Sequence, residues 1–288
     1  MKLDDLLPNL GEWLRGTGPE SDVVVSTRIR LARNLADLPF ATRATAAHKA
    51  EVIARAKEAI AKADAGHRLE YADIPSLAPL DRQFLVERQL ISRELAGGLE
   101  GPRGVAFDPT ETASVMVNEE DHLRLQVLRS GFALDEAWSD IDKLDDALEQ
   151  RLTYAFHTQF GYLTACPTNV GTGMRASVML HLPALGLTKQ IDKVFRALQK
   201  INLAVRGLHG EGSRAFGDLY QISNHVTLGK SEGKILGEIR EVIVTIMQYE
   251  RQARAALMKE RRQAEHDRAH RAVGTLGSAT MITAEETM

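Results

Sequence analysis

The sequence has little cysteine and few aromatic side chains: one cysteine, Cys166, and 5% Phe, Trp and Tyr in 288 residues. A single cysteine excludes an internal disulfide framework and a cysteine-rich zinc module. No apolar run approaches the roughly 18 residues of a membrane span, and the acidic start of the chain is too briefly apolar for a signal peptide. We therefore expect a reduced, soluble, cytoplasmic protein with no membrane partner.

The chain also lacks a dominant charge of one sign. Lys and Arg number 36 and Asp and Glu number 39, which gives a formal net charge of −3. This balance creates no global basic field, so nucleic acid is not expected as the main partner. The apolar share of 44% and the charged share of 26% are typical of a globular protein with one large domain or two modest ones.

Hydrophobic periodicity predicts a mixture of helices and strands. Helices are expected over most of 44–97, from an N-cap at Ser139 to about 156, over 188–201, and over 231–272. Strands are expected in 21–34, 98–121, 160–185, 202–213 and 219–229. Near the end, Thr283 and Glu286 form a capping-box pattern that predicts another helix. Because a one-turn helix is not stable alone, we expect that the natural chain continues and that this one is truncated.

Two glycine patterns that suggest nucleotide binding lack the necessary context. "GTGMRA" at 171–176 fits a dinucleotide fingerprint, but the alternating residues after it predict a strand, where a helix is required. "GKS" at 229–231 resembles the end of a P-loop, but Asn224 stands where the first glycine should be. His266 and His270 have metal-ligand spacing on a helix, although a solvated polar face explains them better, and no resident metal site is expected.

Five arginines lie at predicted junctions between strands and loops: Arg28, Arg30, Arg124, Arg175 and Arg206. Arg28 and Arg30 alternate, so they point the same way if their segment is extended. Any one of the five could be an ordinary surface ion pair. Together they favour a site for a polyanion, because the guanidinium group matches phosphate oxygens and stays charged, and glycine loops let backbone N–H groups approach the same oxygens. The pattern predicts a nucleotide triphosphate site without a P-loop.

Two acidic segments could lie opposite that site. One is the "VNEEDHLR" segment, with Glu119, Glu120 and Asp121, and the other contains Glu211. Neighbouring carboxylates repel one another, and the pKa of at least one should rise unless a cation lies between them. A guanidinium group is such a cation, and its planar face suits paired carboxylates.

The motifs "STRIRLARN", "VNEEDHLR", "CPTNVGTGMRASV", "RGLHGEGS" and "ISNHVTLGKSE" occur in one order over residues 20–250. Together they resemble the phosphagen (guanidino) kinase family, and the wording is most similar to its bacterial protein-arginine kinase branch. The resemblance implies an α+β fold in which an antiparallel β-sheet is flanked by α-helices. It also implies that the chain lacks the small N-terminal helical domain of small-guanidine kinases, which would leave the guanidine pocket more open to a protein.

The resemblance assigns roles to individual residues. Glu120, Glu211 and Cys166 match the family's catalytic positions, and Thr168 and Asn169 lie beside the cysteine. Residues that match the family's ATP and phosphate contacts are Ser26, Thr27, Arg28, Ile29, Arg30, Gln89, Arg124, Arg175, Ala176, Ser177, Val178, Met179, Arg206, Gly207, Leu208, His209 and Gly210. Cys166 is either a thiolate beside the arginines or a small structural residue.

Three positions depart from the family pattern. Gln89 and Met179 replace histidines near the nucleotide, and His209 replaces an arginine of the glycine loop. These changes affect the adenine contacts and part of the closing loop. The expected domains are a segment over 1–19, the catalytic domain over 20–250 and a helical region over 251–288. A C-terminal phosphoarginine-binding region found in the branch does not occur in these residues.

The resemblance implies an enzyme that uses ATP and Mg²⁺ to phosphorylate arginine side chains of protein substrates. Glu120 or Glu211, with Glu120 favoured, would accept a proton from the guanidinium group. A Clp ATPase, a zinc-binding activator and a second copy of the chain in a homodimer are the partners that the resemblance suggests. Two alternatives remain: a kinase for free arginine or another small guanidine, and an adaptor that keeps the fold with weak activity.

Overall fold

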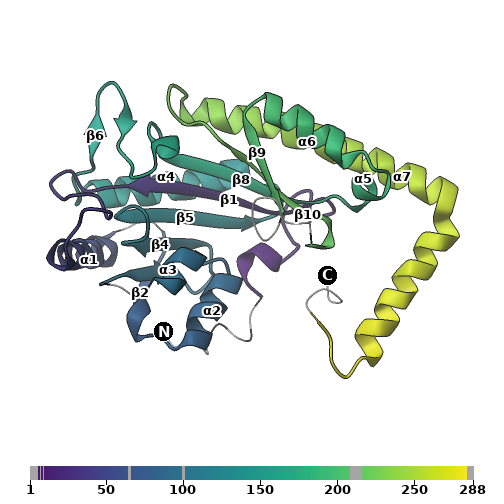
Figure 1. Ribbon diagram of the computed structural model, residues 1–288, viewed down its shortest axis with the longest axis horizontal. Helices are drawn as coiled ribbons and strands as arrows, with labels where there is room; N and C mark the ends of the chain where they lie inside the picture. The colour runs from purple at the N-terminus through teal and green to yellow at the C-terminus, as the bar shows by residue number, and fades with distance from the viewer. Residues whose placement is uncertain are drawn as a thin grey trace.

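The computed structural model describes residues 6, 8, 10–63, 66–98, 101–207 and 216–283. Eight strands form one antiparallel sheet in the order β2-β3-β4-β5-β1-β8-β10-β9, and β6 and β7 form a separate hairpin (Figure 1). The strands are β1 (Val24–Arg33), β2 (Glu70–Asp73), β3 (Gly104–Phe107), β4 (Ala113–Val117), β5 (Leu123–Ser130), β6 (Phe156–His157), β7 (Gly161–Tyr162), β8 (Met174–His181), β9 (Leu203–Gly207) and β10 (Leu219–Asn224). The expected antiparallel α+β fold is confirmed.

The described helices lie on both sides of the sheet. They are α1 (Ala46–Lys62), α2 (Pro79–Glu87), α3 (Arg93–Gly97), α4 (Leu134–Glu149), α5 (Pro183–Leu187), α6 (Ile191–Lys200) and α7 (Glu232–Ser278). Short 3₁₀ turns occur at Glu12–Leu14, Ile74–Ser76, Pro167–Asn169 and Phe216–Asp218. No helix in the described part of the chain is both long and apolar enough to cross a membrane.

One face of the sheet forms the main hydrophobic core. Because side chains alternate along a strand, Ile29 and Leu31 of β1 point to this face, where both are buried. Apolar residues of α1, α4 and α7 pack against it, and on α4 these include Ile141, Leu144 and Leu148 at helical spacing. We call this side the core face.

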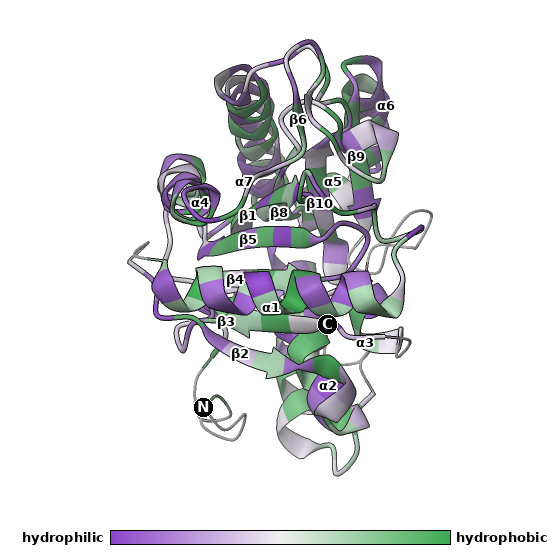
Figure 2. Ribbon diagram, turned by 90° about the vertical axis from the view of Figure 1, so that its left-hand side faces the viewer, coloured by the Kyte–Doolittle hydropathy of each residue, from purple (hydrophilic) through white to green (hydrophobic). Residues whose placement is uncertain are grey.

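The opposite face is covered only in part. A second apolar cluster joins Val105, Phe107 and Met116 of β3 and β4 to Leu85 of α2 and Leu95 of α3. The cluster holds α2 and α3 over one end of the sheet, as Figure 2 shows at its lower right. Over β5, β1, β8 and β9 this side carries polar and charged residues instead, and we call it the open face.

Two local predictions differ from the structure. Residues 44–97 contain three helices, but they also contain β2, which pairs with β3 at the edge of the sheet. The prediction that Ser139 is an N-cap is wrong, because α4 already begins at Leu134 and Ser139 lies inside it. Asp135 and Glu136 in the first turn favour this earlier start through the helix dipole. The expected helix after Thr283 lies outside the described residues.

The long C-terminal helix agrees with its prediction to within a few residues. Ser231 caps α7 by accepting a hydrogen bond from the backbone N–H of Lys234 at 3.3 Å. Its buried residues end at Leu257, and a non-helical backbone at Arg261 bends it (φ −133°). Figure 1 shows the part after this bend leading away from the sheet. The domain boundary expected after residue 250 falls inside this helix.

A buried ion pair ties the sheet to α4 beside the β6–β7 hairpin. Arg33 Nε donates to Oδ1 of Asp145 at 3.2 Å and to Oδ2 at 3.0 Å, and Arg33 Nη2 donates to Oδ2 at 2.5 Å. Arg33 also donates to the backbone oxygen of Thr172 at 2.9 Å, and its guanidinium lies 3.6 Å from the ring centre of Tyr162. The pair therefore fixes the loop that precedes β8 against the end of β1.

Replacing Asp145 by asparagine should lower the free energy of unfolding by about 2–3 kcal/mol, because Arg33 loses charge-assisted hydrogen bonds while it stays buried. Urea denaturation followed by circular dichroism measures this. Asp37→Asn is the matched control, since the Asp37–Arg55 pair is exposed and should be worth less than about 1 kcal/mol. Equal effects of the two substitutions would show that the buried pair has no special role.

Candidate active site

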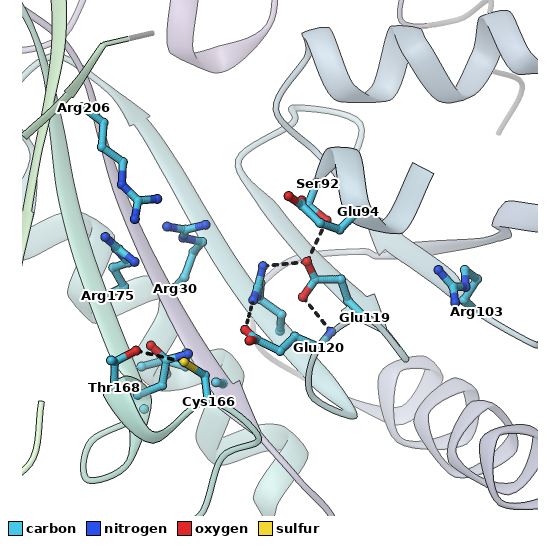
Figure 3. A pocket seen from close by; sticks show the side chains of 15 residues that line it. Arg30, Ser92, Glu94, Arg103, Glu119, Glu120, Cys166, Thr168, Arg175 and Arg206 are labelled. Carbon is cyan, nitrogen blue, oxygen red and sulfur yellow. Dashed lines mark hydrogen bonds and ion pairs between the residues drawn. The ribbon is translucent and has the colours of Figure 1, made fainter. Parts of the chain in front are cut away.

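Strand register brings the five predicted arginines to the open face. Arg30 of β1 lies directly opposite Arg175 of β8, and Arg124 of β5 lies opposite Ala32 of β1. Arg28 is two residues from Arg30 on the same side. Arg206 of β9 lies opposite Gln221 of β10, which pairs in turn with Met179 of β8. Figure 3 shows Arg30, Arg175 and Arg206 pointing into one space. The prediction that these arginines gather on one surface is therefore met by their positions.

Acidic partners are unevenly distributed among these arginines, since Arg124 pairs with Glu119 and Glu120. Neither Arg28 nor Arg30 has a salt bridge to any carboxylate in the described ranges, and Nε of Arg30 is buried without a hydrogen-bond partner. Burial, together with repulsion from Arg175 and Arg124, lowers the pKa of Arg28 to about 10. Burial and the neighbouring arginines likewise hold the pKa of Arg30 well below its usual range. Like charges placed directly opposite in a sheet are destabilising, so this surface is suited to a polyanion.

The acidic segment forms the turn between β4 and β5. Asn118 adopts a left-handed backbone (φ 59°), and its backbone N–H donates to the oxygen of His122 at 2.9 Å. Its side-chain nitrogen donates to the backbone oxygens of Lys49 at 2.8 Å and Pro102 at 2.9 Å. Asparagine tolerates this conformation better than most residues do. The turn therefore has a fixed shape and holds Glu119 and Glu120 beside the arginines.

Glu119 and Glu120 have different surroundings. The side chain of Glu119 is 4% exposed and accepts from Ser92 Oγ and from Arg124 Nη1, each at 2.8 Å. Its second oxygen accepts from the backbone N–H of Glu120 at 2.8 Å. The side chain of Glu120 is 44% exposed and accepts from Arg124 Nη2 at 3.0 Å. Glu119 is thus fully engaged, whereas Glu120 faces the open space.

Burial raises the pKa of Glu120; Arg124 opposes the rise, and the neighbouring carboxylates of Asp121 and Glu119 add to it. A raised pKa brings a carboxylate closer to neutrality as a proton acceptor. It also agrees with the expectation that one member of this cluster has a raised pKa.

Asp121 and His122 point away from the pocket and hold loops together. Asp121 is fully buried and accepts from Asn34 Nδ2 and from the backbone N–H of Ala165, each at 2.7 Å. His122 Nδ1 accepts from the backbone N–H of Leu35 at 3.0 Å. That bond leaves the ring proton on Nε2, which lies 3.0 Å from the backbone oxygen of Pro39. Burial lowers the pKa of His122, so a neutral ring suits this structural position.

The arginines and carboxylates line one pocket of about 530 Å³. Its lining residues are Arg30, Leu31, Ala32, Ser92, Glu94, Arg103, Glu119, Glu120, Arg124, Cys166, Thr168, Asn169, Gly173, Arg175 and Arg206. Cys166 Sγ lies 3.0 Å from Thr168 Oγ1 at the base of the pocket. Figure 3 shows Arg30, Arg175 and Arg206 on one side and Glu119 and Glu120 on the other. The pocket can therefore hold a polyanion against a cation.

Other predicted site residues surround the arginines without lining the pocket. Arg28 donates to Gln89 Oε1 at 3.1 Å and to Gln221 Oε1 at 2.7 Å, so Gln89 lies beside the arginine set. Ser177 and Met179 also lie on the open face, opposite Arg28 and Ser26. Gly207 ends β9 one residue after Arg206.

Some predicted residues point elsewhere or are outside the described ranges. The side chains of Thr27, Ile29, Ala176 and Val178 lie on the core face and are 0% exposed, so only their backbones could approach a ligand. Thr27 Oγ1 donates to the backbone oxygen of Gly131 at 2.7 Å. The residues that lie outside the described part of the chain are Leu208, His209, Gly210 and Glu211.

The sequence did not single out several pocket residues. Ser92, Glu94 and Arg103 come from α3 and the loop before β3, which reach the pocket only because α3 packs on the sheet. The position of Ser92 could have been predicted, because serine is a preferred N-cap residue. In the structure it caps α3 by accepting a hydrogen bond from the backbone N–H of Leu95 at 3.0 Å. Gln221 and Ser223 were also not predicted; they lie outside the pocket lining but accept hydrogen bonds from Arg28 and Arg175, and they alternate in "LYQISN" as residues on one strand face do.

Comparison with known proteins identifies the family to which the chain belongs. Residues 51–253 match the model for ATP:guanido phosphotransferase, C-terminal catalytic domain, and the chain belongs to this family. The resemblance expected from the five motifs is confirmed.

Within that family, the chain is similar to curated proteins named protein-arginine kinase. The chain is 49% identical over 289 residues to the protein-arginine kinase of Halothermothrix orenii, covering 100% of this chain and 82% of the relative. It is 48% identical to the protein-arginine kinase of Symbiobacterium thermophilum, covering 96% of this chain and 79% of the relative.

Solved structures of small-guanidine kinases share the fold. Taurocyamine kinase from Schistosoma mansoni with bound transition-state analogue components aligns with a TM-score of 0.74 and 28% identity, covering 82% of this chain and 34% of that one. Lombricine kinase aligns with a TM-score of 0.73 and 25% identity, covering 88% of this chain and 72% of that one.

Proposed function

We propose that this chain transfers the γ-phosphoryl group of ATP to the guanidinium group of arginine side chains in proteins. The observation that carries the proposal is one pocket with repelling arginines on one wall and the Glu119–Glu120 pair on the other. Membership of the ATP:guanido phosphotransferase family supports ATP as the donor. Relatives named protein-arginine kinase support a protein-bound arginine as the acceptor.

The arginine wall binds the triphosphate. Arg28, Arg30, Arg124, Arg175 and Arg206 neutralise its charge and stabilise the charge that develops on the equatorial oxygens during transfer. The unpaired Nε of Arg30 fits such a ligand, because an anion there would satisfy a buried donor. Gln89 and the open-face residues of β1 and β8 lie beside Arg28 and hold this end of the arginine wall in place.

Mg²⁺ would accompany the triphosphate and neutralise part of its charge. The described residues contain no group of three or more His, Cys, Asp or Glu side chains placed to hold a metal ion. The phosphate oxygens would therefore provide most of its ligands, with water.

The carboxylate wall binds the acceptor. Glu120 holds the guanidinium group in line with the γ-phosphorus and accepts the proton that a guanidinium nitrogen gives up as its new bond to phosphorus forms and the bond from phosphorus to ADP breaks. This proton transfer matters because arginine keeps its proton at neutral pH. Glu211, by family resemblance, is the second carboxylate, and Cys166 lies beside the reacting groups. When the substrate arginine binds, Glu120 releases Arg124 and pairs with the substrate guanidinium group instead.

The finer assignments rest on family resemblance. We assign the catalytic domain to residues 20–250, with segments 1–19 and 251–288 flanking it. A Clp ATPase, a zinc-binding activator and a homodimer partner are the interactions that the resemblance supports, and the cytoplasm is the corresponding location.

The test is incubation of the wild-type chain and Mg-ATP with an unstructured peptide that contains one arginine, with its lysine counterpart, and with free arginine. Phosphorylation of the arginine peptide, without phosphorylation of the lysine peptide, is expected by intact mass. A much higher kcat/KM for free arginine would instead identify a small-guanidine kinase. Failure of all three acceptors with ATP still bound would favour an adaptor.

A further inference from the structure

Four large apolar side chains lie exposed on two segments next to the pocket. Phe156 and Phe160 of the β6–β7 hairpin are 57% and 43% exposed, and Val226 and Leu228 of the loop after β10 are 37% and 50% exposed. We call these four residues the apolar rim. Figures 1 and 2 both show the hairpin standing out from the main sheet. Exposed apolar groups that gather beside a pocket indicate a binding surface.

The two segments meet on the loop that forms the pocket wall. Tyr162 and Gly171 exchange backbone hydrogen bonds of 2.8 and 3.2 Å, which join the hairpin to this loop. A Cβ on Gly171 would lie 2.9 Å from Cα of Leu228, so the loop after β10 presses against the same residue. Thr227 Oγ1 also donates to the backbone oxygens of Thr168 at 2.9 Å and Val170 at 2.7 Å. The apolar rim is thus attached to the wall that carries Cys166, Thr168 and Asn169.

The hairpin holds its aromatic rings in fixed positions. Phe156 packs edge-on against Tyr162 at 5.3 Å between ring centres, and the Tyr162 ring lies against the guanidinium of Arg33. His157 stacks on Phe160 at 4.8 Å. A two-stranded hairpin is marginally stable alone, so these contacts keep it ordered while the outer ring faces remain exposed. Such a surface binds another chain with little loss of side-chain freedom.

We propose that the apolar rim binds large apolar side chains that flank the target arginine in a polypeptide substrate. This inference rests on the proposed function, because a pocket that receives a guanidinium group of a protein must also accommodate the chain on both sides of it. Free arginine has no side chain that reaches the rim. The preferred substrate class is therefore an arginine within an apolar, accessible stretch of polypeptide.

The test compares two fluorescent peptides with one central arginine, flanked by leucine and phenylalanine or by glycine and serine. Fluorescence anisotropy measures their binding to wild-type chain and to the double variant Phe160→Ser, Leu228→Ser. The wild-type chain should bind the apolar peptide roughly 10-fold more tightly, as apolar contacts of this size allow. The double variant should bind the two peptides equally. Its affinity for both should match the affinity of the wild-type chain for the glycine–serine peptide. Val244→Ser is the matched control, because Val244 of α7 is also 37% exposed and lies outside the rim.

Two results would overturn the inference: equal binding of the two peptides by the wild-type chain, or an unchanged preference in the double variant. Because the readout is binding, it does not depend on phosphoryl transfer. A chain that prefers the apolar peptide but phosphorylates neither would refute the proposed function and leave the rim supported. A chain that binds both peptides equally and phosphorylates both equally would support the proposed function and refute the role of the apolar rim.

Discussion

Replacing Glu120 by glutamine should lower kcat for an arginine peptide by about 10²–10⁴-fold, the usual contribution of a general base. Glutamine keeps the size of the side chain but removes the negative charge that faces the guanidinium group. The affinity for Mg-ATP should not fall, because Glu120 pairs with Arg124 and its neutralisation frees that arginine for phosphate. Single-turnover kinetics measures the transfer step, and calorimetry measures nucleotide binding.

The pH dependence gives a second sign of the same role. Because burial raises the pKa of Glu120, the ionised form that binds and accepts a proton is lost at a higher pH than for an ordinary glutamate. The acid limb of kcat/KM should lie above the usual range of glutamate and disappear in the Glu120→Gln variant. Glu241→Gln on the exposed face of α7 is the control and should keep both rate and profile. Transfer at the wild-type rate in Glu120→Gln would remove Glu120 from the mechanism.

Replacing Arg30 by methionine should have opposite effects on activity and stability. Arg30 lies opposite Arg175 and near Arg28, at the centre of the arginine wall. Loss of one such charge-stabilising arginine should lower kcat by about 10³–10⁵-fold. Without nucleotide, the same change removes a repulsion between facing like charges, so the free energy of unfolding should rise by about 0.5–1 kcal/mol.

Urea denaturation with and without Mg-ATP separates these effects. The wild-type chain should gain about 2.7 kcal/mol at a nucleotide concentration of 100 times Kd, and the Arg30→Met variant should gain much less at that concentration. Arg240→Met is the control, because Arg240 forms an exposed pair with Asp135 on the far side of the core. A variant that is less stable without nucleotide would contradict the view that the arginines repel one another in the absence of a polyanion.

The sequence predicted the arginine wall because its signals are local. Arg28 and Arg30 alternate within one strand, and each remaining arginine adjoins a strand end that β-branched residues mark. Their spatial meeting could not be derived from periodicity, since it depends on the pairing of β1 with both β5 and β8. The family resemblance implied an antiparallel sheet but not which strands pair, so the structure supplies that information.

The carboxylate wall was less predictable. "NEED" offers three acids in a row, and only the turn geometry shows that Asp121 points into the loops while Glu120 faces the pocket. Ser92 reaches Glu119 through the packing of α3 on β3 and β4, a contact between residues 27 positions apart. Similarly, β2 escaped prediction because a four-residue edge strand has too short a pattern to stand out among helices.

The most direct test of the account locates the transferred phosphoryl group. A peptide with one arginine, isotopically labelled at its guanidinium nitrogens, is incubated with Mg-ATP and the wild-type chain, and the product is examined by phosphorus NMR. We expect a phosphorus resonance that is coupled to a guanidinium nitrogen and is lost in acid. An acid-stable resonance without that coupling, as for a phosphorylated hydroxyl, would contradict it.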